Sequence, residues 1–344
     1  MRFLFYDVIV DVASSRKDLN DYLEKIYGGI KTASDGGQDA DIKITISWEK
    51  NFSDFKNKIL GLEEHDWKRV DAQTYLGRGA CFYNDKIDKR NTQIFFLERN
   101  GKFVFEIVRQ EKWLADVFRK DIGGQLTRWV YYFICFPLSF YLERFRQMHP
   151  LHAGLTVFQG KNVVIMGLAS MGKTSLALEM ARRGNALLLS DNLSFYNDKQ
   201  IFPCYEPIKT RDGEKSIDQN LFQLVLETRF RQYYLSKAFD PGGRIPQVLI
   251  LPCFSADPFV KELSPQEAAL FVMNANVLVS EIKKYFSCAN MWNFALAGNS
   301  LLTAQRDSFG KLISRSRCYQ LGIGARETIP QTVDRIQQLL ERQI

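Results

Sequence analysis

A single stretch of eight residues limits what this chain can fold into: Gly167-Leu168-Ala169-Ser170-Met171-Gly172-Lys173-Thr174. It matches the pattern Gly-x-x-x-x-Gly-Lys-Ser/Thr, in which the two glycines let the backbone curl and point its N–H groups at phosphate oxygens. In this pattern the lysine contacts the β- and γ-phosphates, and the threonine hydroxyl ligates magnesium. An apolar strand enters the stretch and a helix leaves it. The sequence therefore predicts a strand–loop–helix site for a nucleoside triphosphate with Mg²⁺. We expect ATP, although the motif itself does not select between ATP and GTP.

Two further positions extend this nucleotide site. Ser175 is a second hydroxyl after Lys173, in a position that fits helix packing better, and it joins the nucleotide-binding candidates. Asp191 follows the apolar strand Ala186 to Leu189, where an acid of the Walker B kind projects from the strand's end. It could hold magnesium or accept the proton of an attacking hydroxyl. The alternative is an Asp that caps the following turn. Asn192 beside it can form hydrogen bonds but cannot be a base.

From His149-Pro150 onward, strands alternate with helices. The predicted elements are strands at Leu155 to Phe158 and Asn162 to Met166 around a Gln159-Gly160 turn, a helix at Thr174 to Arg183 that Gly184 stops, a strand at Ala186 to Leu189 buried on both faces, a strand at Gln247 to Leu251 and an amphipathic helix at Thr332 to Arg342. This order is typical of an α/β domain whose strands share one sheet.

The first part of the chain is predicted to be α+β. Its expected elements are a strand at Phe3 to Val12, a helix at Arg16 to Tyr27 capped by Ser14 or Ser15, a loop at Lys31 to Asp41, a strand at Ile42 to Trp48, strands at Thr92 to Leu97 and Phe103 to Arg109, and helices at Lys112 to Arg119 and Leu126 to Met148. Asn100-Gly101 is the strongest hairpin signal in the sequence. We therefore expect two domains, 1–148 and 149–344, and we expect the first to supply acceptor or partner recognition.

Composition favours an ordinary globular protein, with 46% hydrophobic and 25% charged residues and a formal charge of +7. Six scattered cysteines form no zinc signature and no compact disulfide framework, which favours a reducing cytosol. No secretory signal opens the chain, and the apolar stretch Trp129 to Leu142 is too short to span a bilayer. We expect a cytoplasmic protein without a nucleic-acid partner, and the acids Glu63 and Glu64, next to His65, are expected to form an exposed run rather than a metal site.

The region from Leu151 to Tyr196 resembles the HPr kinase/phosphorylase family, most closely the related bacterial kinases that are not HPr kinases themselves. The resemblance rests on Leu151-His152-Ala153-Gly154, then Gln159-Gly160-Lys161, the phosphate loop, Arg183-Gly184 and Leu189-Ser190-Asp191-Asn192. It is looser through Lys209 to Arg211 and faint from Arg317 onward. It implies an α/β P-loop kinase domain of the HPr-kinase, PEP-carboxykinase-like type, preceded by a smaller α+β domain. Relatives of this kind are often oligomers.

The resemblance also implies roles for individual residues. His152 would lie near the phosphates and assist the chemistry, or else be a structural His bonded to backbone. Asp191 would be the general base, and Asn192 stands where the family often has a second acid. That departure weakens magnesium binding by two carboxylates and the reverse phosphorylase activity. Lys209, Arg211 and Arg244 are possible transition-state cations or acceptor contacts, or else solvated surface residues. Arg229 and Arg231 are weaker candidates on an expected helix.

Three functions fit these features. The first is a kinase that binds ATP and magnesium and transfers the γ-phosphoryl group to a hydroxyl of a protein, a peptide or a small molecule. The second is a nucleotide-dependent switch or ATPase without a phospho-acceptor. The third is an inactive nucleotide-binding module. The separation of only 18 positions between Lys173 and Asp191 suits the HPr-kinase-like arrangement and favours the kinase. That preference rests largely on family analogy.

Overall fold

The computed structural model describes residues 1–32, 39–50, 53–62, 65–87, 90–111, 122–183, 186–211, 217–228, 231–237, 239–298 and 301–342, without the side chains of residues 53, 122 and 211. Two compact units make up the chain. Unit 1 contains Met1–Arg146, Thr228–Phe230 and Tyr285–Ser300, and unit 2 contains Gln147–Glu227, Arg231–Lys284 and Leu301–Ile344. The segment 285–300 therefore packs with the first unit although it lies far along the sequence.

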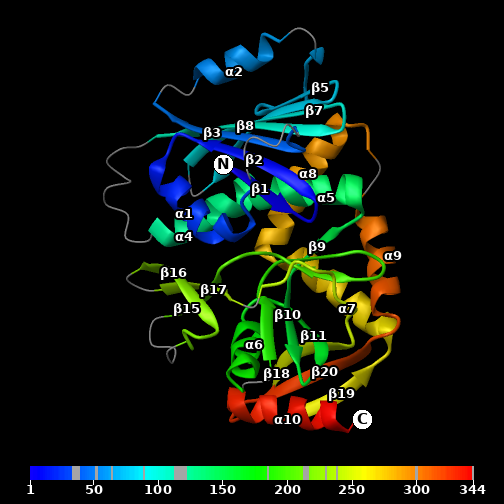
Figure 1. Ribbon diagram of the computed structural model, residues 1–344. Helices are drawn as coiled ribbons and strands as arrows, with labels where there is room; N and C mark the ends of the chain where they lie inside the picture. The colour runs from blue at the N-terminus through cyan, green and yellow to red at the C-terminus, as the bar shows by residue number, and fades with distance from the viewer. Residues whose placement is uncertain are drawn as a thin grey trace. The chain divides into compact units, whose positions relative to one another are not determined.

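Unit 1 is built on a mixed eight-stranded sheet with the strand order β1-β2-β3-β8-β7-β6-β5-β4 (Figure 1). Its strands are β1 (Arg2–Phe5), β2 (Val8–Ser14), β3 (Ile42–Glu49), β4 (Lys68–Arg69), β5 (Thr74–Gly77), β6 (Ala80–Ile87), β7 (Arg90–Arg99) and β8 (Lys102–Gln110). Its helices are α1 (Lys17–Tyr27), η1 (Gly28–Ile30), α2 (Ser53–Leu60), α4 (Ile122–Val130), the π-helical η3 (Tyr131–Cys135), α5 (Phe136–Arg146) and most of α8 (Ser280–Ala295).

Aromatic side chains fill much of the interior of unit 1. Phe103 of β8 stacks on Phe140 of α5, with ring centroids 5.3 Å apart, and Trp292 of α8 packs against Phe96 and Phe105. The apolar stretch Trp129 to Leu142 supplies part of this interior through η3 and α5. No helix in the described part of the chain is long and apolar enough to cross a membrane.

The hairpin predicted at Asn100-Gly101 is confirmed, because β7 and β8 pair antiparallel and both turn residues have positive φ, 55° and 74°. Another prediction was wrong. The single strand expected over Phe3 to Val12 is a hairpin, β1 and β2, with Tyr6 and Asp7 at positive φ in its turn. The sequence lacks a glycine or an asparagine there, so the turn gave no signal. Helix α1 begins after Arg16, which forms no side-chain cap, so the expected serine cap is absent.

Unit 2 is built on a six-stranded sheet with the order β12-β10-β11-β18-β20-β19, accompanied by two three-stranded sheets, β14-β13-β9 and β15-β17-β16 (Figure 1). The strands are β9 (His149–Leu151), β10 (Ala153–Phe158), β11 (Lys161–Met166), β12 (Ala186–Ser190), β13 (Ser194–Tyr196), β14 (Ile201–Pro203), β15 (Ile208–Arg211), β16 (Phe222–Thr228), β17 (Arg231–Ser236), β18 (Val248–Ser255), β19 (Phe259–Leu263) and β20 (Arg317–Gly324). The helices are α6 (Lys173–Arg182), α7 (Pro265–Leu278), the start of α8, α9 (Leu301–Ile313) and α10 (Ile329–Glu341).

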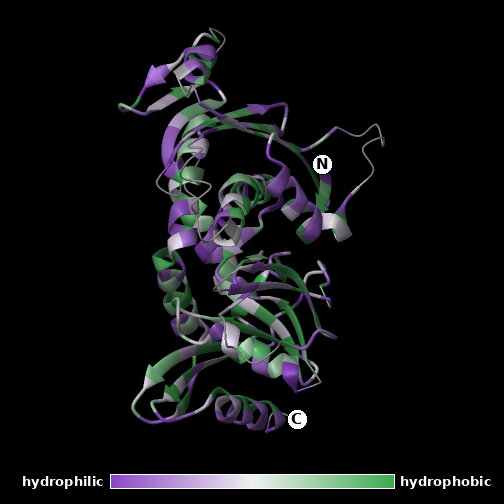
Figure 2. Cartoon of the chain, turned by 90° about the vertical axis from the view of Figure 1, so that its left-hand side faces the viewer, coloured by the Kyte–Doolittle hydropathy of each residue, from purple (hydrophilic) through white to green (hydrophobic). Residues whose placement is uncertain are grey.

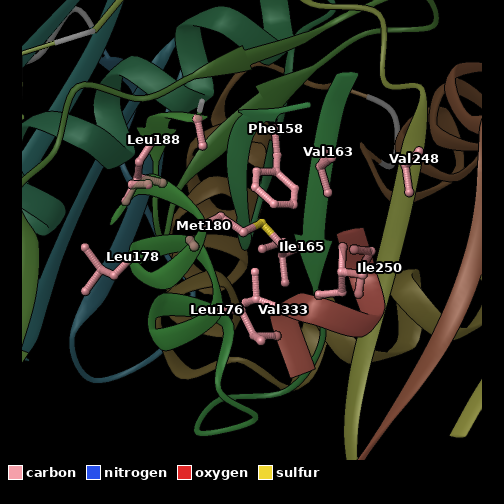
Figure 3. Packing of buried hydrophobic residues seen from close by; sticks show 14 of the residues in the cluster. Phe158, Val163, Ile165, Leu176, Leu178, Met180, Leu188, Val248, Ile250 and Val333 are labelled. Atoms are coloured by element: carbon pink, nitrogen blue, oxygen red, sulfur yellow. The ribbon is translucent and has the colours of Figure 1, made fainter. Parts of the chain in front are cut away.

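Alternation along the central strands places helices on both faces of this sheet. On one face, Val163 and Ile165 of β11 pack in a cluster with Leu176 of α6 and Val333 of α10, and Figure 3 shows these side chains gathered between the strands and the two helices. On the other face, Val164 and Met166 of β11 pack with residues of α7 and α9. Unit 2 is therefore a helix–sheet–helix sandwich, and the prediction of a mixed α/β fold is confirmed.

Most elements predicted for this part are found within a few residues of the expected bounds. Helix α10 was expected at Thr332 to Arg342 and begins at Ile329, and Figure 2 shows hydrophilic and hydrophobic residues mixed along it. Strand β12 was expected to be buried on both faces, but Leu187 is 45% exposed because β12 is an edge strand. Arg231 lies on strand β17 and not on a helix, while Gly184, Arg229 and the helix expected at Lys112 to Arg119 lie outside the described residues.

Candidate nucleotide-binding site

The phosphate loop and Asp191 lie at the same edge of the six-stranded sheet. Strand β10 pairs antiparallel with both β11 and β12, so β11 and β12 run parallel to each other. The loop begins directly after β11, and Asp191 directly follows β12. Because the carboxyl ends of parallel strands meet at one edge, this topology brings together two segments that the sequence separates by a helix. Ligands of open α/β sheets bind at such edges.

The loop backbone has the conformations that a phosphate cradle requires. Gly167 has φ 142° and Gly172 has φ 81°, so a side chain at either position would be strained. Ser170 at the tip also has a left-handed φ of 65°, and Ala169 and Ser170 are exposed. Helix α6 starts at Lys173, immediately after Gly172. Its first N–H groups have no intrahelical partner and therefore remain available to an anion.

Lys173 turns back over the loop that precedes it. Its ammonium group donates hydrogen bonds to the carbonyl oxygens of Gly167, at 3.0 Å, and Leu168, at 2.8 Å. The side chain is only 6% exposed, and this burial lowers the pKa of the ammonium to about 8, although the charges of Asp191 and Glu281 partly oppose the shift. The lysine is thus held at the loop by two neutral acceptors that phosphate oxygens could replace.

Thr174 and Asp191 form the contact that joins the loop to strand β12. The Thr174 hydroxyl donates to Asp191 Oδ2 at 3.0 Å. Asp191 is 2% exposed, so its carboxylate lies beneath the loop rather than in solvent. Ser175 follows in the first turn of α6 and is partly exposed. Hydroxyl and carboxylate oxygens are the ligands that Mg²⁺ prefers, so this pair fits a magnesium ion better than a softer metal.

His152 lies beside the same loop, between β9 and β10. Its imidazole has a pKa of about 3, lowered first by burial and then by the charge of Lys173, while a hydrogen bond to the Asn192 backbone opposes the shift. The ring is therefore neutral at pH 7. It could donate or accept a hydrogen bond near the phosphates, but it does not supply a positive charge there.

The side chain of Asn276, at the end of α7, fixes the backbone around His152. Its Oδ1 accepts the His152 N–H at 2.9 Å, and its Nδ2 donates to the Pro150 carbonyl at 3.4 Å. Asn276 is 2% exposed, so both bonds are shielded from water. Glu281, in the first turn of α8, then adds its charge near Lys173. Neither residue carries a local sequence signal that links it to the site, and both follow the phosphate loop by about a hundred positions.

Glu206 is a buried carboxylate that sequence reasoning missed. Its Oε1 accepts the backbone N–H of Asn192 at 2.8 Å and also that of Leu193. The side chain is 8% exposed. It therefore binds the turn that directly follows Asp191 and limits how that turn can move. A Glu followed by Pro207 in a loop had no distinguishing pattern, and only the folded chain brings it back to β12.

The remaining predicted cations lie on elements other than the phosphate loop and β12. Lys209 lies on β15 opposite Tyr233 of β17 and is exposed, and Arg211 ends that strand with a side chain outside the described residues. The Arg244 guanidinium is engaged by Asp240 of its own loop, and its backbone pairs with Ile201. His65 is buried and packs against Trp67 and Phe95, while Glu63 and Glu64, predicted as an exposed run, lie outside the described residues. No group of metal-ligating residues occurs within the described ranges.

Neither a protein-family model nor a curated protein matches the chain. A solved structure of the Hpr(Ser) kinase/phosphatase from Coxiella burnetii is similar at 13% sequence identity and a TM-score of 0.27. The match covers 56% of this chain and 99% of that chain. This is a distant structural similarity, and at that TM-score it carries no argument about the chemistry of this chain.

The lowered pKa of Lys173 predicts a pH-dependent affinity for nucleotide. If nucleotide phosphates bind at the loop, they favour the charged lysine and therefore raise its pKa. Affinity for ATP with magnesium should be constant up to pH 7 and should fall as the pH rises through about 8, by up to about tenfold per pH unit. Calorimetric titration across this range measures the effect. Lys173→Met keeps the aliphatic stem without the charge and should remove the fall, whereas a profile that is unchanged by this variant would contradict the prediction.

Glu206→Gln should lower turnover without weakening nucleotide binding. The amide oxygen still accepts the N–H groups of Asn192 and Leu193, but it loses the charge that strengthens such bonds by about 1 kcal/mol. We expect kcat to fall about fivefold, because a loss of about 1 kcal/mol corresponds to that factor in rate, while KM for ATP stays nearly unchanged. Glu206→Ala should fall further and lower Tm, because it leaves two backbone donors without their acceptor. Equal kcat in wild type and both variants would rule out the positioning role.

Proposed function

We propose that this chain is an ATP- and magnesium-dependent kinase that transfers the γ-phosphoryl group to a hydroxyl. The observation that carries the proposal is the 3.0 Å hydrogen bond between Thr174 of the loop and Asp191 after β12. This bond joins Thr174, whose hydroxyl can ligate magnesium, to Asp191, whose carboxylate can act as a base, at one edge of the sheet. The resemblance of Leu151 to Tyr196 to the HPr kinase/phosphorylase family supports the choice of a hydroxyl as acceptor.

The residues of the loop fit a triphosphate. The backbone from Gly167 to Thr174 would hold the phosphate oxygens with its N–H groups, and Lys173 would exchange its two carbonyl partners for them. Thr174 and Asp191 would hold Mg²⁺, which when bound neutralises charge on the phosphates. Water is kept from Lys173 and Asp191 by their burial, and this strengthens their electrostatic interactions with a bound nucleotide.

Asp191 would serve as the base. Its carboxylate would accept the proton of the acceptor's hydroxyl, so that the oxygen could attack the γ-phosphorus while ADP leaves. Glu206 would keep the Asp191 turn in place, and Asn276 would do the same for His152. Neutral His152 would orient a phosphate or acceptor oxygen through a hydrogen bond. Asn192 cannot replace a second acid, and a reverse phosphorylase activity is not part of this proposal.

A switch or slow ATPase is the second candidate. The observation that favours it is the ion pair between Arg244 and Asp240, because a predicted transition-state cation is already paired with a carboxylate of its own loop. Such proteins often receive an arginine from a partner or a second copy. In that case Asp191 would act on water instead of an acceptor hydroxyl.

Incubation with γ-labelled ATP, Mg²⁺ and an extract of the source cells distinguishes these functions. The kinase proposal predicts label on a hydroxyl of a protein, a peptide or a small molecule, and the label should depend on the added chain. Label released only as inorganic phosphate would favour the ATPase. If the chain consumes no nucleotide with any extract, the proposal is wrong and the chain is a nucleotide-binding module at most.

A further inference from the structure

A groove on the other edge of unit 2 has no role in the proposed reaction. It has a volume of about 1210 Å³, and its walls come from the turn between β13 and β14, the start of α7 and the second half of α9. Ile245, which precedes β18, and Arg315, which precedes β20, also line it. The groove therefore lies at the amino ends of the parallel strands, whereas the phosphate loop follows their carboxyl ends. We refer to it as the α7–α9 groove.

The charge of the α7–α9 groove is unbalanced. Four exposed cations line it: Lys199, Arg306, Lys311 and Arg315. Only two carboxylates, Asp198 and Asp307, line it as well. Within the described part of the chain, none of the four cations forms an ion pair. A cluster of like charges around a concave surface attracts an anionic partner and speeds its association.

The groove also presents apolar surface. Ile245 is 57% exposed and Leu270 is 53% exposed, and both line it beside the cations. Exposed apolar side chains rimmed by charge are typical of protein interaction sites. An extended peptide points alternate side chains to opposite sides, so it can place apolar groups on the floor and carboxylates toward the rim.

Nucleic acid fits these features less well. Single strands bind where bases stack on aromatic side chains, and the lining residues include no aromatic side chain among those described. Asp198 and Asp307 would also face a continuous row of phosphates.

We propose that the α7–α9 groove binds an extended acidic segment of a partner protein in which carboxylates alternate with apolar residues. This proposal is independent of the kinase function.

Fluorescence anisotropy with a labelled peptide that alternates Glu and Leu tests the groove on the full chain. We expect binding that weakens with salt and is about tenfold weaker in the Arg306→Glu, Lys311→Glu double variant. Lys261 and Arg342 are exposed cations of unit 2 that do not line the groove. The Lys261→Glu, Arg342→Glu variant changes net charge equally and should bind like wild type.

A second variant distinguishes weaker peptide binding from loss of folding. Gly310 lies on α9 in the groove wall, and a Cβ there would meet nothing within 4 Å. Gly310→Glu adds a carboxylate while it relieves the cost of glycine in a helix, so it should fold well and bind the peptide more weakly than Gly310→Gln. Equal affinity across all variants, or tighter binding of a single-stranded RNA than of the peptide, would overturn the proposal.

Discussion

Lys173→Ala is expected to abolish phosphoryl transfer. In the proposed reaction the lysine is the cation that the loop directs at the phosphates, and in the structure its ammonium contacts the Gly167 and Leu168 carbonyls. Loss of one well-placed donor to developing negative charge costs on the order of 10²–10³-fold in turnover. Affinity for ATP should fall as well, because the ground-state phosphates lose the same contact. Turnover is measured as consumption of γ-labelled ATP with Mg²⁺, and affinity is measured by calorimetry.

Folding must be separated from chemistry in this variant. Lys173 is nearly buried, so the alanine also leaves a small void and two carbonyl groups without their donor. Lys173→Met restores most of the side-chain volume and should show the same loss of turnover with a smaller change in Tm. Lys261→Ala, which removes an exposed cation from β19, is the matched control and should be fully active. Full activity of Lys173→Met would refute the assignment of the site.

The part of the site that sequence could predict is the part that is local. Residues Gly167 to Thr174 are contiguous, and each glycine is required by its own backbone conformation, so the motif indicates a geometry directly. Asp191 was predicted because it closes the next apolar strand, and its contact with Thr174 follows from the parallel direction of β11 and β12. The alternation of apolar and polar residues predicted strands, and apolar residues repeating about every 3.6 positions predicted helices.

The supporting residues are non-local, and for that reason the sequence did not reveal them. Glu206 and Asn276 act through backbone groups, and a backbone N–H carries no sequence signature. The turn at Tyr6-Asp7 has positive φ without the usual residues, so one strand was predicted where the chain forms two. The exposure of Leu187 depends on the order of strands in the sheet, which the composition of β12 alone cannot indicate.

Asp191→Asn is expected to remove turnover while nucleotide binding largely remains. The amide oxygen can still accept the Thr174 hydroxyl, so the loop and β12 stay joined. It cannot accept a proton from the attacking hydroxyl, and loss of a general base costs about 10²–10⁴-fold. Label transfer from ATP measures this loss. Ser190→Ala changes the neighbouring residue, whose hydroxyl bonds Ser194 instead, and serves as the matched control.

The same substitution has a second consequence that separates the roles of Asp191. Its negative charge raises the pKa of Lys173 against the effect of burial, so the neutral amide should lower that pKa below its wild-type value of about 8. The fall in affinity for ATP should therefore begin at a lower pH in Asp191→Asn than in wild type. At about pH 6.5 the affinities of the variant and the wild type for ATP should be nearly equal. If affinity is instead lost at every pH, Asp191 is mainly a metal ligand or a structural residue. If turnover survives, another group is the base, and exposed Glu281, whose charge also acts on Lys173, becomes the residue to test.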